Sequence, residues 1–185
     1  MDKIVKKKDM GKEFESRIQK NAKDSGIYTY RIKDVNLPPD IRMRVKLGKN
    51  RYDFIFFHNK ILIPSELKST KSMSFSFGGS NPKIKPHQLE ALTEDIQYKN
   101  VIPTLTLNFR EPNNRAFIVP IHLFNLYVQA AEGVIEKTLD GRHNEKSIPL
   151  HIVEKIGIEI DNIKKRTRHT YSIKDALDEL TNKYE

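Results

Sequence analysis

The sequence predicts an α/β fold, a mixed β-sheet flanked by helices with a helical segment at the C-terminus. Stretches with helical spacing and stretches with strand-like alternation follow one another through residue 121 as a helix, three or four strands, a second helix and two more strands. The chain has 185 residues, enough for one core and cramped for two, and it shows no internal repeat. We therefore expect a single domain over residues 1–185, with its core at about 9–132 and an appended helical segment at 134–185.

The first segments of the core are an expected helix and an expected hairpin. Phe14, Ile18 and Ala22 recur at four-residue spacing, which predicts a helix over residues 9–24 that ends at Gly26. Alternation and β-forming residues predict strands at 27–33, 52–57 and 61–68, the last two joined by a hairpin loop at 58–60.

A stretch before the hairpin alternates strictly between apolar and basic residues. Arg42, Arg44 and Lys46 fall on one side of residues 41–47, and apolar residues fall on the other. This pattern predicts a strand or an extended arm with a basic side, after a break at 36–40 that contains two prolines.

The rest of the chain is expected to alternate between loops, helices and strands. We expect a mobile Ser-, Gly- and Lys-rich loop at 69–85, a helix at 86–98, strands at 101–108 and 115–121, a helix at 123–132 and a polar irregular stretch at 134–147. Ser147 and Pro149 predict the start of a short helix, and Ser172 with Asp175 predicts a capping box at the start of the last helix.

Composition narrows the class of partner. The formal net charge of +9 favours an anionic partner, with nucleic acid before an acidic membrane surface, although a solvated basic surface would give the same total. The absence of cysteine excludes disulfides, thiolate zinc sites and cysteine nucleophiles. No apolar run approaches the roughly 20 residues that span a bilayer, and the basic N-terminus lacks a signal-peptide core. We expect a soluble, cytoplasmic protein.

Glu66 and Lys68 are the first candidates for chemistry. Residues two apart on a strand share a face, so both side chains project together while Leu67 points to the core. The apolar residues before them make this strand central, and buried charge is costly unless it is paired or bound to a metal. A Glu-x-Lys triplet taken alone is more often a surface salt bridge.

Asp53 on the preceding strand strengthens the case. Counting back from a hairpin with Phe57 opposite Ile61 brings Asp53 level with Glu66 if a one-residue bulge lies at Pro64. Facing carboxylates repel unless a divalent cation lies between them, and such hard oxygen ligands suit Mg²⁺, with Mn²⁺ able to substitute.

This arrangement predicts metal-assisted hydrolysis of a phosphodiester. The backbone carbonyl of Leu67 would add a third metal ligand to Asp53 and Glu66. The metal would polarise the phosphate and lower the pKa of a bound water, and Lys68 would orient that water or stabilise developing charge.

Glu15 and Gln88 are two further candidates on helices. Glu15 lies at the edge of the first helix's apolar stripe, from which it can reach the site, or it is an ordinary exposed glutamate. Gln88 lies near the start of the second helix. It can bind a water, a metal ligand or a phosphate, or it can hydrogen-bond the helix start.

The chain resembles the PD-(D/E)xK nuclease superfamily, a restriction-endonuclease-like fold, and within it the RecU-like Holliday junction resolvases of bacteria and phages. Five segments carry the resemblance: Gly11-x-x-Phe14-Glu15, Tyr52-Asp53-Phe54, Ser65-Glu66-Leu67-Lys68-Ser69, Ser74-Phe75-Ser76-Phe77 and His87-Gln88-Leu89. Two departures accompany it, since Arg51-Tyr52 replaces the proline-containing start of the motif and the stretch matching the family's projecting stalk is short.

The resemblance implies a Mg²⁺-dependent homodimeric endonuclease that cuts branched DNA in recombination and repair. It implies Asp53 and Glu66 as metal ligands, Lys68 as the water-activating or stabilising residue, and Glu15 and Gln88 as supporting residues. The alternatives are a restriction- or exonuclease-type enzyme of the same superfamily, and a non-catalytic DNA-binding protein on the same scaffold.

Basic residues around this site are candidates for phosphate contacts, although each cluster alone is typical of a solvated surface. The expected DNA-binding set is Arg42, Arg44, Lys46, Lys49, Arg51, Lys71, Lys83 and Lys85. For a further basic cluster, Lys164 to Arg168, two interpretations stay open: a contact with DNA, or a basic surface without a ligand. Phe75 and Phe77 are expected to pack under their loop rather than to wedge against bases.

Overall fold

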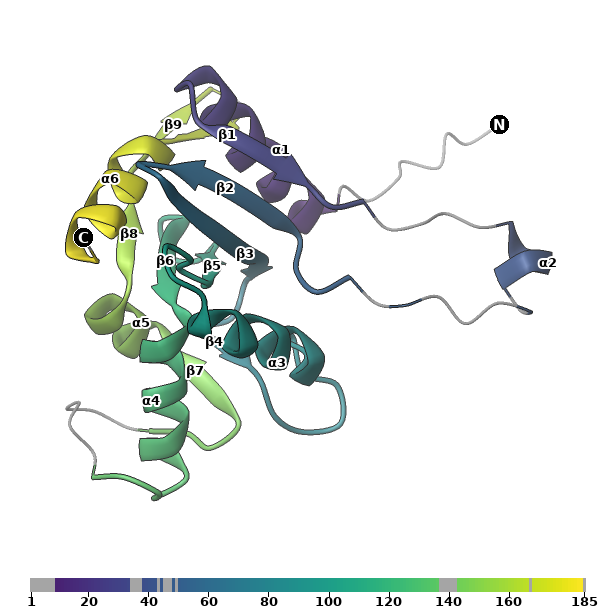
Figure 1. Cartoon of the computed structure of the whole chain (residues 1–185), viewed down its shortest axis with the longest axis vertical. Helices are drawn as coiled ribbons and strands as arrows, with labels where there is room; N and C mark the ends of the chain where they lie inside the picture. The colour runs from purple at the N-terminus through teal and green to yellow at the C-terminus, as the bar shows by residue number, and fades with distance from the viewer. Residues whose placement is uncertain are drawn as a thin grey trace.

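A six-stranded mixed sheet forms the centre of the protein (Figure 1). The structure, a computed structural model, describes residues 9–33, 38–42, 44, 48, 50–136, 143–166 and 168–184. Its elements are α1 (Met10–Asp24), β1 (Tyr28–Arg31), α2 (Pro39–Arg42), β2 (Phe54–His58), β3 (Ile61–Thr70), β4 (Ser74–Ser76), α3 (Pro86–Glu94), the 3₁₀ helix η1 (Asp95–Gln97), β5 (Thr104–Phe109), β6 (Arg115–Pro120), α4 (Ile121–Ala131), β7 (Ser147–Pro149), α5 (Leu150–Ile156), β8 (Ile158–Ile160), β9 (Asn162–Lys165), β10 (Arg168–Tyr171) and α6 (Ile173–Lys183).

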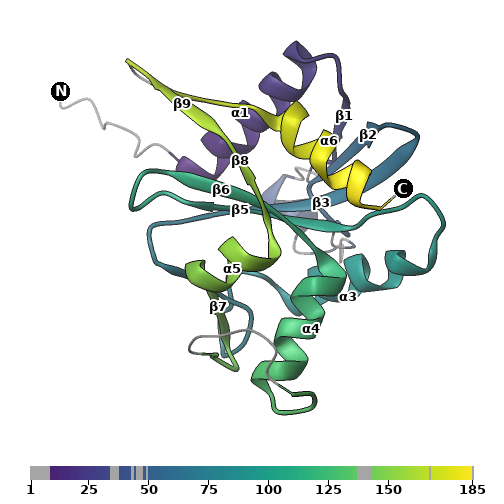
Figure 2. The ribbon, with the colours of Figure 1, turned by 90° about the vertical axis from the view of Figure 1, so that its left-hand side faces the viewer.

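The main sheet has the strand order β1-β2-β3-β5-β6-β8. The central pair, β3 and β5, is parallel, and every other neighbouring pair in this sheet is antiparallel. Seen edge-on, the sheet separates α1 and α6 on one face from α3, α4 and α5 on the other (Figure 2). The predicted class, a mixed sheet flanked by helices with a helix at the C-terminus, is confirmed.

Each face of the sheet has its own apolar core. Phe14 and Ile18 of α1 pack with Leu177 of α6 over Phe54 and other inward residues of the sheet. The opposite core joins Leu92 of α3 and Phe124 of α4 to inward residues of β5 and β6. The predicted stripe of α1 is therefore buried as expected, and Asp9 caps that helix by accepting hydrogen bonds from the backbone N–H groups of Gly11 (3.1 Å) and Lys12 (3.2 Å).

The β2–β3 hairpin has a register different from the predicted one. Asn59 and Lys60 alone form the turn, with φ values of 47° and 63°, so His58 pairs with Ile61. Two-residue turns with positive φ match the twist of a hairpin, which explains the shorter loop. Phe54 then lies opposite Ser65, and the predicted bulge at Pro64 is wrong because Asp53 comes level with Glu66 without it.

The predicted mobile loop at 69–85 contains ordered structure. Its β4 strand pairs with β7 in a second small sheet, and Phe75 and Phe77 are buried. Phe75 makes an edge-to-face contact with Phe109 at 4.9 Å, and Phe77 makes one with Phe124 at 5.4 Å. The expectation of packing for both phenylalanines is confirmed, and the expectation of a wholly mobile loop is wrong because these two rings anchor it to the core.

Two other expectations need correction. Within 41–47, Ile41 and Arg42 belong to the short helix α2 rather than to a strand, and 43 and 45–47 lie outside the described residues. The C-terminal part was expected to be helical, yet β8 adds the sixth strand to the main sheet and β9 and β10 form a hairpin. These strands have only three or four residues each, too few to show a clear alternation. The last helix begins at Ile173 as expected, but the Ser172 side chain makes no capping hydrogen bond.

In the described parts of the chain, no helix combines the length and the apolar character needed to cross a membrane.

Because Phe75 is fully buried, Phe75→Ala is expected to lower the free energy of unfolding by about 3–5 kcal/mol. Urea unfolding followed by circular dichroism measures this change. Met73→Ala, on the same segment but with a half-exposed side chain, serves as the control and should change stability by less than about 0.5 kcal/mol. Equal effects of the two substitutions would show that the 69–85 segment does not belong to the core.

Candidate active site

Glu66 is at the centre of the site that the sequence predicts. It lies on β3, one of the two central strands, and the whole residue is 0% exposed. Lys68 Nζ and Gln88 Nε2 both donate hydrogen bonds to Glu66 Oε1. Glu66 Oε2 is also buried and has no hydrogen-bond partner among the described residues. One carboxylate oxygen is thus held by two donors, and the other is left for a further ligand.

Asp53 lies just before β2, on the strand edge beside Glu66. Its Oδ2 accepts a hydrogen bond from the Leu67 backbone N–H at 3.1 Å. The N–H and C=O of one strand residue point to the same edge, so the Leu67 carbonyl is directed toward the Asp53 side of β3. The three predicted metal ligands therefore come from two neighbouring strands and converge on one edge.

Gln88 is held at both ends of its amide. Its Oε1 accepts a hydrogen bond from the Lys85 backbone N–H at 3.0 Å, and its Nε2 donates to Glu66. The contact with Lys85 satisfies a backbone donor at the start of α3, as in a capping box. The two interpretations of Gln88 given by the sequence are therefore both present, since the residue closes the helix start and also contacts the site.

Glu15 reaches the same region from α1. It is half-buried, and Arg31 Nη2 donates a hydrogen bond to its Oε2. Burial, and after it the charge of Asp53, raises the pKa of Glu15, while Arg31 and Lys68 oppose that rise. The carboxyl group is thus close enough to Asp53 and Lys68 to sense both charges.

Arg31 is a member of the site that the sequence reasoning missed. It stands opposite Phe54 on the neighbouring strand, and its guanidinium carbon lies 5.8 Å from the centre of that ring. The sequence feature that could have identified Arg31 is its position near the end of the predicted strand at 27–33, the strand next to the one that follows Asp53. Arg31 holds the Glu15 carboxylate in place by an ion pair.

Burial dominates the electrostatics of Glu66. It raises the pKa of this carboxyl group to about 8, the Lys68 ammonium acts in the opposite direction, and the nearby Asp53 carboxylate adds to the rise. Without a divalent cation beside it, Glu66 therefore does not ionise easily at neutral pH. Such a cation would offset the repulsion from Asp53.

The described residues contain no group of three or more Asp, Glu or His side chains arranged as a metal site. The predicted ligand set would not meet that description, since it consists of two carboxylates and one backbone oxygen. Hard oxygen donors of this kind, with waters and substrate oxygens in the remaining positions, are typical of Mg²⁺ sites.

The side chains of two of the predicted DNA-binding residues, Arg51 and Lys85, form hydrogen bonds within the protein. Arg51 forms ion pairs with Glu94 at 3.0 Å and Asp95 at 2.8 Å, and it also donates to the Ala91 carbonyl. These contacts tie the segment before Asp53 to α3, so Arg51 has a positioning role that the sequence did not indicate. Lys85 Nζ donates to Asn81 Oδ1 at 2.7 Å.

The other predicted phosphate contacts divide between exposed and undescribed positions. Lys71 is mostly exposed, 3.6 Å from Glu111, and Lys83 is exposed in the segment before α3. Arg44 is exposed, the side chain of Arg42 is outside the described part, and Lys46 and Lys49 lie outside the described residues.

No protein-family model matches the chain. A relative in Bacillus subtilis (strain 168), the SPbeta prophage-derived uncharacterized protein YotM, is 42% identical over 173 residues, which cover 94% of this chain and 87% of the relative. The chain belongs to the YotM family. The aligned region of 173 residues therefore includes nearly the whole chain.

The fold of this YotM-family chain is similar to that of Hjc from Archaeoglobus fulgidus, a Holliday junction resolvase from an archaeal hyperthermophile. The TM-score is 0.50 and the sequence identity 13%, over 80% of this chain and 95% of Hjc. The similarity between the two proteins is therefore one of fold, and the roles of the individual residues of the site do not follow from it.

Since its pKa is about 8 in the folded protein, Glu66 keeps its proton there while the unfolded chain loses it above its ordinary value of 4.5. Glu66 therefore stabilises the fold fully below that value, and this contribution is lost as pH rises toward 8 and beyond. In EDTA, the free energy of unfolding of the wild type should fall more between pH 5 and pH 8 than that of Glu66→Gln. Urea titrations across this range measure the difference, and parallel pH profiles of the two proteins would contradict the buried, protonated Glu66.

Proposed function

We propose that the protein is a Mg²⁺-dependent endodeoxyribonuclease of the PD-(D/E)xK type that cleaves branched DNA as a Holliday junction resolvase. One observation carries the proposal: Glu15, Asp53, Lys68 and Gln88 lie around the buried carboxylate of Glu66 on β3, and these five residues were predicted from four separate segments of the sequence. A conserved fold alone would not require that convergence. The similarity of architecture to Hjc and the net charge of +9 support DNA as the substrate.

The residues at this edge fit a divalent metal. Glu66 Oε2 is buried without a hydrogen-bond partner among the described residues, and an oxygen of this kind is unfavourable unless a cation or a proton occupies it. Asp53, Glu66 and the Leu67 carbonyl would hold Mg²⁺, and Mn²⁺ would substitute. The ion would supply polarisation of the scissile phosphate and a bound water of lowered pKa.

The side chains around the ligands have roles that follow from their contacts. Lys68 places a cation beside Glu66, where it can orient the attacking water and stabilise negative charge on the phosphate in the transition state. Gln88 fixes the orientation of the Glu66 carboxylate, and Arg31 fixes that of Glu15. Rotamers held by such contacts preserve the geometry on which phosphoryl chemistry depends. Lys71, Lys83 and Lys85 would contact the phosphate backbone nearby.

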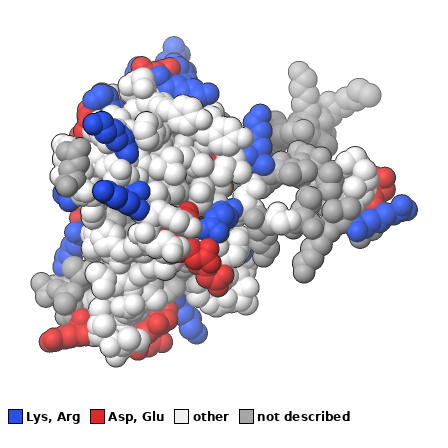
Figure 3. Space-filling model, viewed as in Figure 1, with Lys and Arg blue, Asp and Glu red and all other residues white. Residues whose placement is uncertain are grey.

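A homodimer is part of the proposal, and an exposed aromatic patch supports it. Tyr28, Tyr30 and Phe57 are 62%, 56% and 47% exposed on one side of β1 and β2, and Tyr28 lies directly opposite Phe57. Figure 3 shows mostly uncharged side chains where these strands face the viewer. Exposed apolar patches mark interaction surfaces, and a two-fold dimer would bring the same patch from both copies together.

With Mg²⁺, the wild type is expected to nick a labelled four-way junction symmetrically and to leave a linear duplex of the same sequence uncut. Lys68→Ala and Asp53→Asn should each lower the cleavage rate by at least about 10²-fold, the scale of losing one preorganised charge-stabilising group. EDTA should abolish cleavage.

Three readings separate the outcomes of that experiment. Equal cutting of both DNAs would keep the nuclease and remove the resolvase, leaving a restriction- or exonuclease-type activity. Tight binding without cutting under any metal would leave a non-catalytic DNA-binding protein. Thermal unfolding distinguishes lost metal from lost fold, because Mn²⁺ should raise the melting temperature of the wild type and not that of Asp53→Asn.

The double substitution Tyr28→Glu/Phe57→Glu is expected to convert the dimer into a monomer, because two charges per copy would be buried at the interface. Sedimentation equilibrium measures the molecular mass of each form. Leu126→Glu, at a side chain of α4 that is 48% exposed, is the control and should leave the mass unchanged. A monomeric wild type, or a double variant that remains dimeric, would refute the dimer through this surface.

A further inference from the structure

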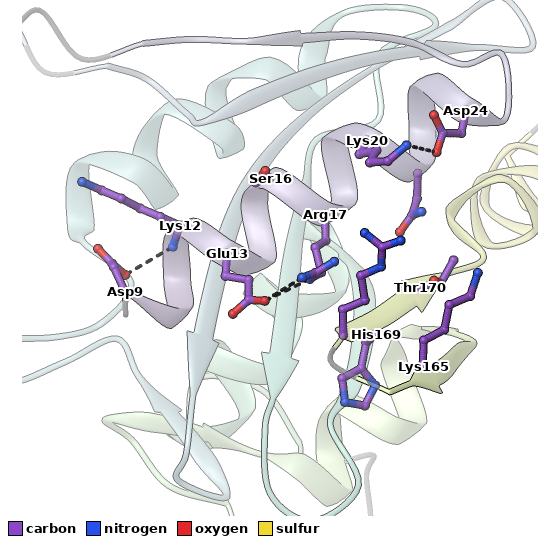
Figure 4. A pocket seen from close by; sticks show the side chains of 12 residues that line it. Asp9, Lys12, Glu13, Ser16, Arg17, Lys20, Asp24, Lys165, His169 and Thr170 are labelled. Carbon is purple, nitrogen blue, oxygen red and sulfur yellow. Dashed lines mark hydrogen bonds and ion pairs between the residues drawn. The ribbon is translucent and has the colours of Figure 1, made fainter. Parts of the chain in front are cut away.

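A groove lined by basic residues lies between α1 and the β9–β10 hairpin (Figure 4). It consists of two adjoining hollows of about 620 and 290 Å³, which share Arg17 of the helix and Lys165 and Arg168 of the hairpin. Together they are lined by eight Lys or Arg and three Asp or Glu residues, a net charge of +5. More than half of the net charge of the chain, +9, is therefore concentrated in one groove.

Hydrogen bonds and one contact between aromatic rings fix the hairpin against the rest of the protein. Asn21 Oδ1 of α1 accepts a hydrogen bond from the Tyr171 backbone N–H at 3.0 Å, and Asn114 Nδ2 donates to the Tyr171 hydroxyl at 2.9 Å. Asn162 Nδ2 donates to the Asn114 carbonyl at 3.0 Å, and the rings of Phe14 and Tyr171 meet edge to face at 5.4 Å. The two walls of the groove therefore have a set spacing, which favours recognition of an extended ligand.

The cations on the two walls of the groove differ in their ion pairs with the described residues. On the helix wall, Arg17 is paired with Glu13 and Lys20 with Asp24. On the hairpin, by contrast, four cations form no ion pair with any residue that the structure describes: Lys164, Lys165, Arg166 and Arg168. Like charges this close repel one another, and a polyanion bound in the groove would relieve that repulsion.

Arg110 links the inner end of the groove to the candidate active site. Its Nε is buried with no hydrogen-bond acceptor among the described residues, and the residue lines the smaller hollow. Its backbone N–H donates to the carbonyl of Thr70 at 2.8 Å, and Thr70 follows Lys68 by two residues on β3. The groove therefore reaches the same strand end from which Lys68 projects.

The helix α1 separates the groove from the active site. Successive helical residues are about 100° apart, so Glu15 and Arg17 project about 200° from each other. Glu15 faces Arg31 and the active site, and Arg17 faces the hairpin. The two sites are thus separated by about one helix diameter, roughly 10 Å, a distance over which one DNA duplex can contact both.

We propose that the groove binds the phosphate backbone of a DNA duplex next to the catalytic centre and holds an arm of the substrate that is not cut. The proposal rests on the proposed nuclease function for DNA as the ligand. The proposal specifies duplex backbone because Phe14 and Tyr171, the Phe and Tyr residues that line the groove, are buried and offer no surface on which bases can stack, and the ring of His169 is held by Asn162 at 2.7 Å. Contacts of this kind position the DNA without reading its sequence.

The test compares two triple variants that each remove three positive charges. Lys164→Gln/Lys165→Gln/Arg168→Gln removes the hairpin cations, and Lys60→Gln/Lys99→Gln/Lys146→Gln removes three exposed lysines elsewhere as a matched control. Binding of a fluorescent duplex is measured by anisotropy in EDTA between about 50 and 200 mM salt, a range over which phosphate contacts dominate the change in affinity.

The hairpin triple should bind at least about tenfold more weakly than the control triple at 200 mM salt and weaker still at 50 mM, because its log–log slope against salt should be shallower by about three, roughly 0.9 per lost phosphate contact. Equal affinities and slopes for the two triples would overturn the groove. Lys165→Glu, a single exposed replacement on β9, gives a second variant if the triple unfolds at a lower temperature than the control.

Failure of the groove and failure of the nuclease lead to different results. Binding in EDTA requires no cleavage, so a selective loss of affinity in the hairpin triple would support the groove even if the wild type never cuts. With Mg²⁺ and junction DNA, the hairpin triple should raise KM while kcat stays within about twofold, since it removes binding that is equal in the ground and transition states. A fall in kcat at unchanged KM would contradict a role in holding a substrate arm.

Discussion

The burial of the Glu66 carboxylate inside the sheet is the constraint on which the rest of the site depends. A charged oxygen at a fully buried position of a central strand is unfavourable unless its surroundings supply donors, a cation or a proton. Lys68 and Gln88 satisfy one oxygen, and Asp53 approaches the same edge from the neighbouring strand. Other arrangements of these residues would leave the carboxylate without compensation, so its burial also selects the position of α3, which carries Gln88.

The two-residue turn of the β2–β3 hairpin determines which carboxylates meet. Because the side chains of a strand alternate between its faces, a shift of one residue in this register would bring a different residue level with Glu66. Arg51 then stabilises the segment before Asp53 by its ion pairs with the end of α3. The arrangement of Asp53 and Glu66 therefore depends on a local turn and on one anchor to α3.

Much of this architecture could be predicted from the sequence. Periodicity located α1, the hairpin, α3 and the β5–β6 pair, because each has enough residues for its apolar pattern to emerge. The pairing of Glu66 with Lys68 followed from the face-sharing of alternate strand residues, and Asp53 followed from counting back along the hairpin with an assumed bulge. The register was wrong by one residue because positive φ at Asn59 and Lys60 cannot be read from a pattern of apolar residues.

The missed features depend on contacts between segments far apart in the chain. Arg31 joins the site through Glu15 on another element, and the strands β8, β9 and β10 are too short for alternation to identify them. The polar composition of 69–85 predicts a mobile loop, whereas its few buried residues, among them Phe75 and Phe77, attach it to the core. Short elements form because they pack against a core that other segments build, and a single sequence does not show which segments those are.

The helix α1 contributes to two surfaces at once, and this has a consequence for how the protein can vary. A rotation of this helix about its axis would carry Glu15 and Arg17 in the same angular direction, away from Arg31 on one flank and from the hairpin on the other. Asn21 and Phe14, which hold the hairpin, also fix that angle. Substitutions at the buried residues of α1 are therefore expected to be correlated with substitutions in both β3 and β10. The reason is that the rotation of this helix about its axis determines the positions of Glu15 and Arg17 together.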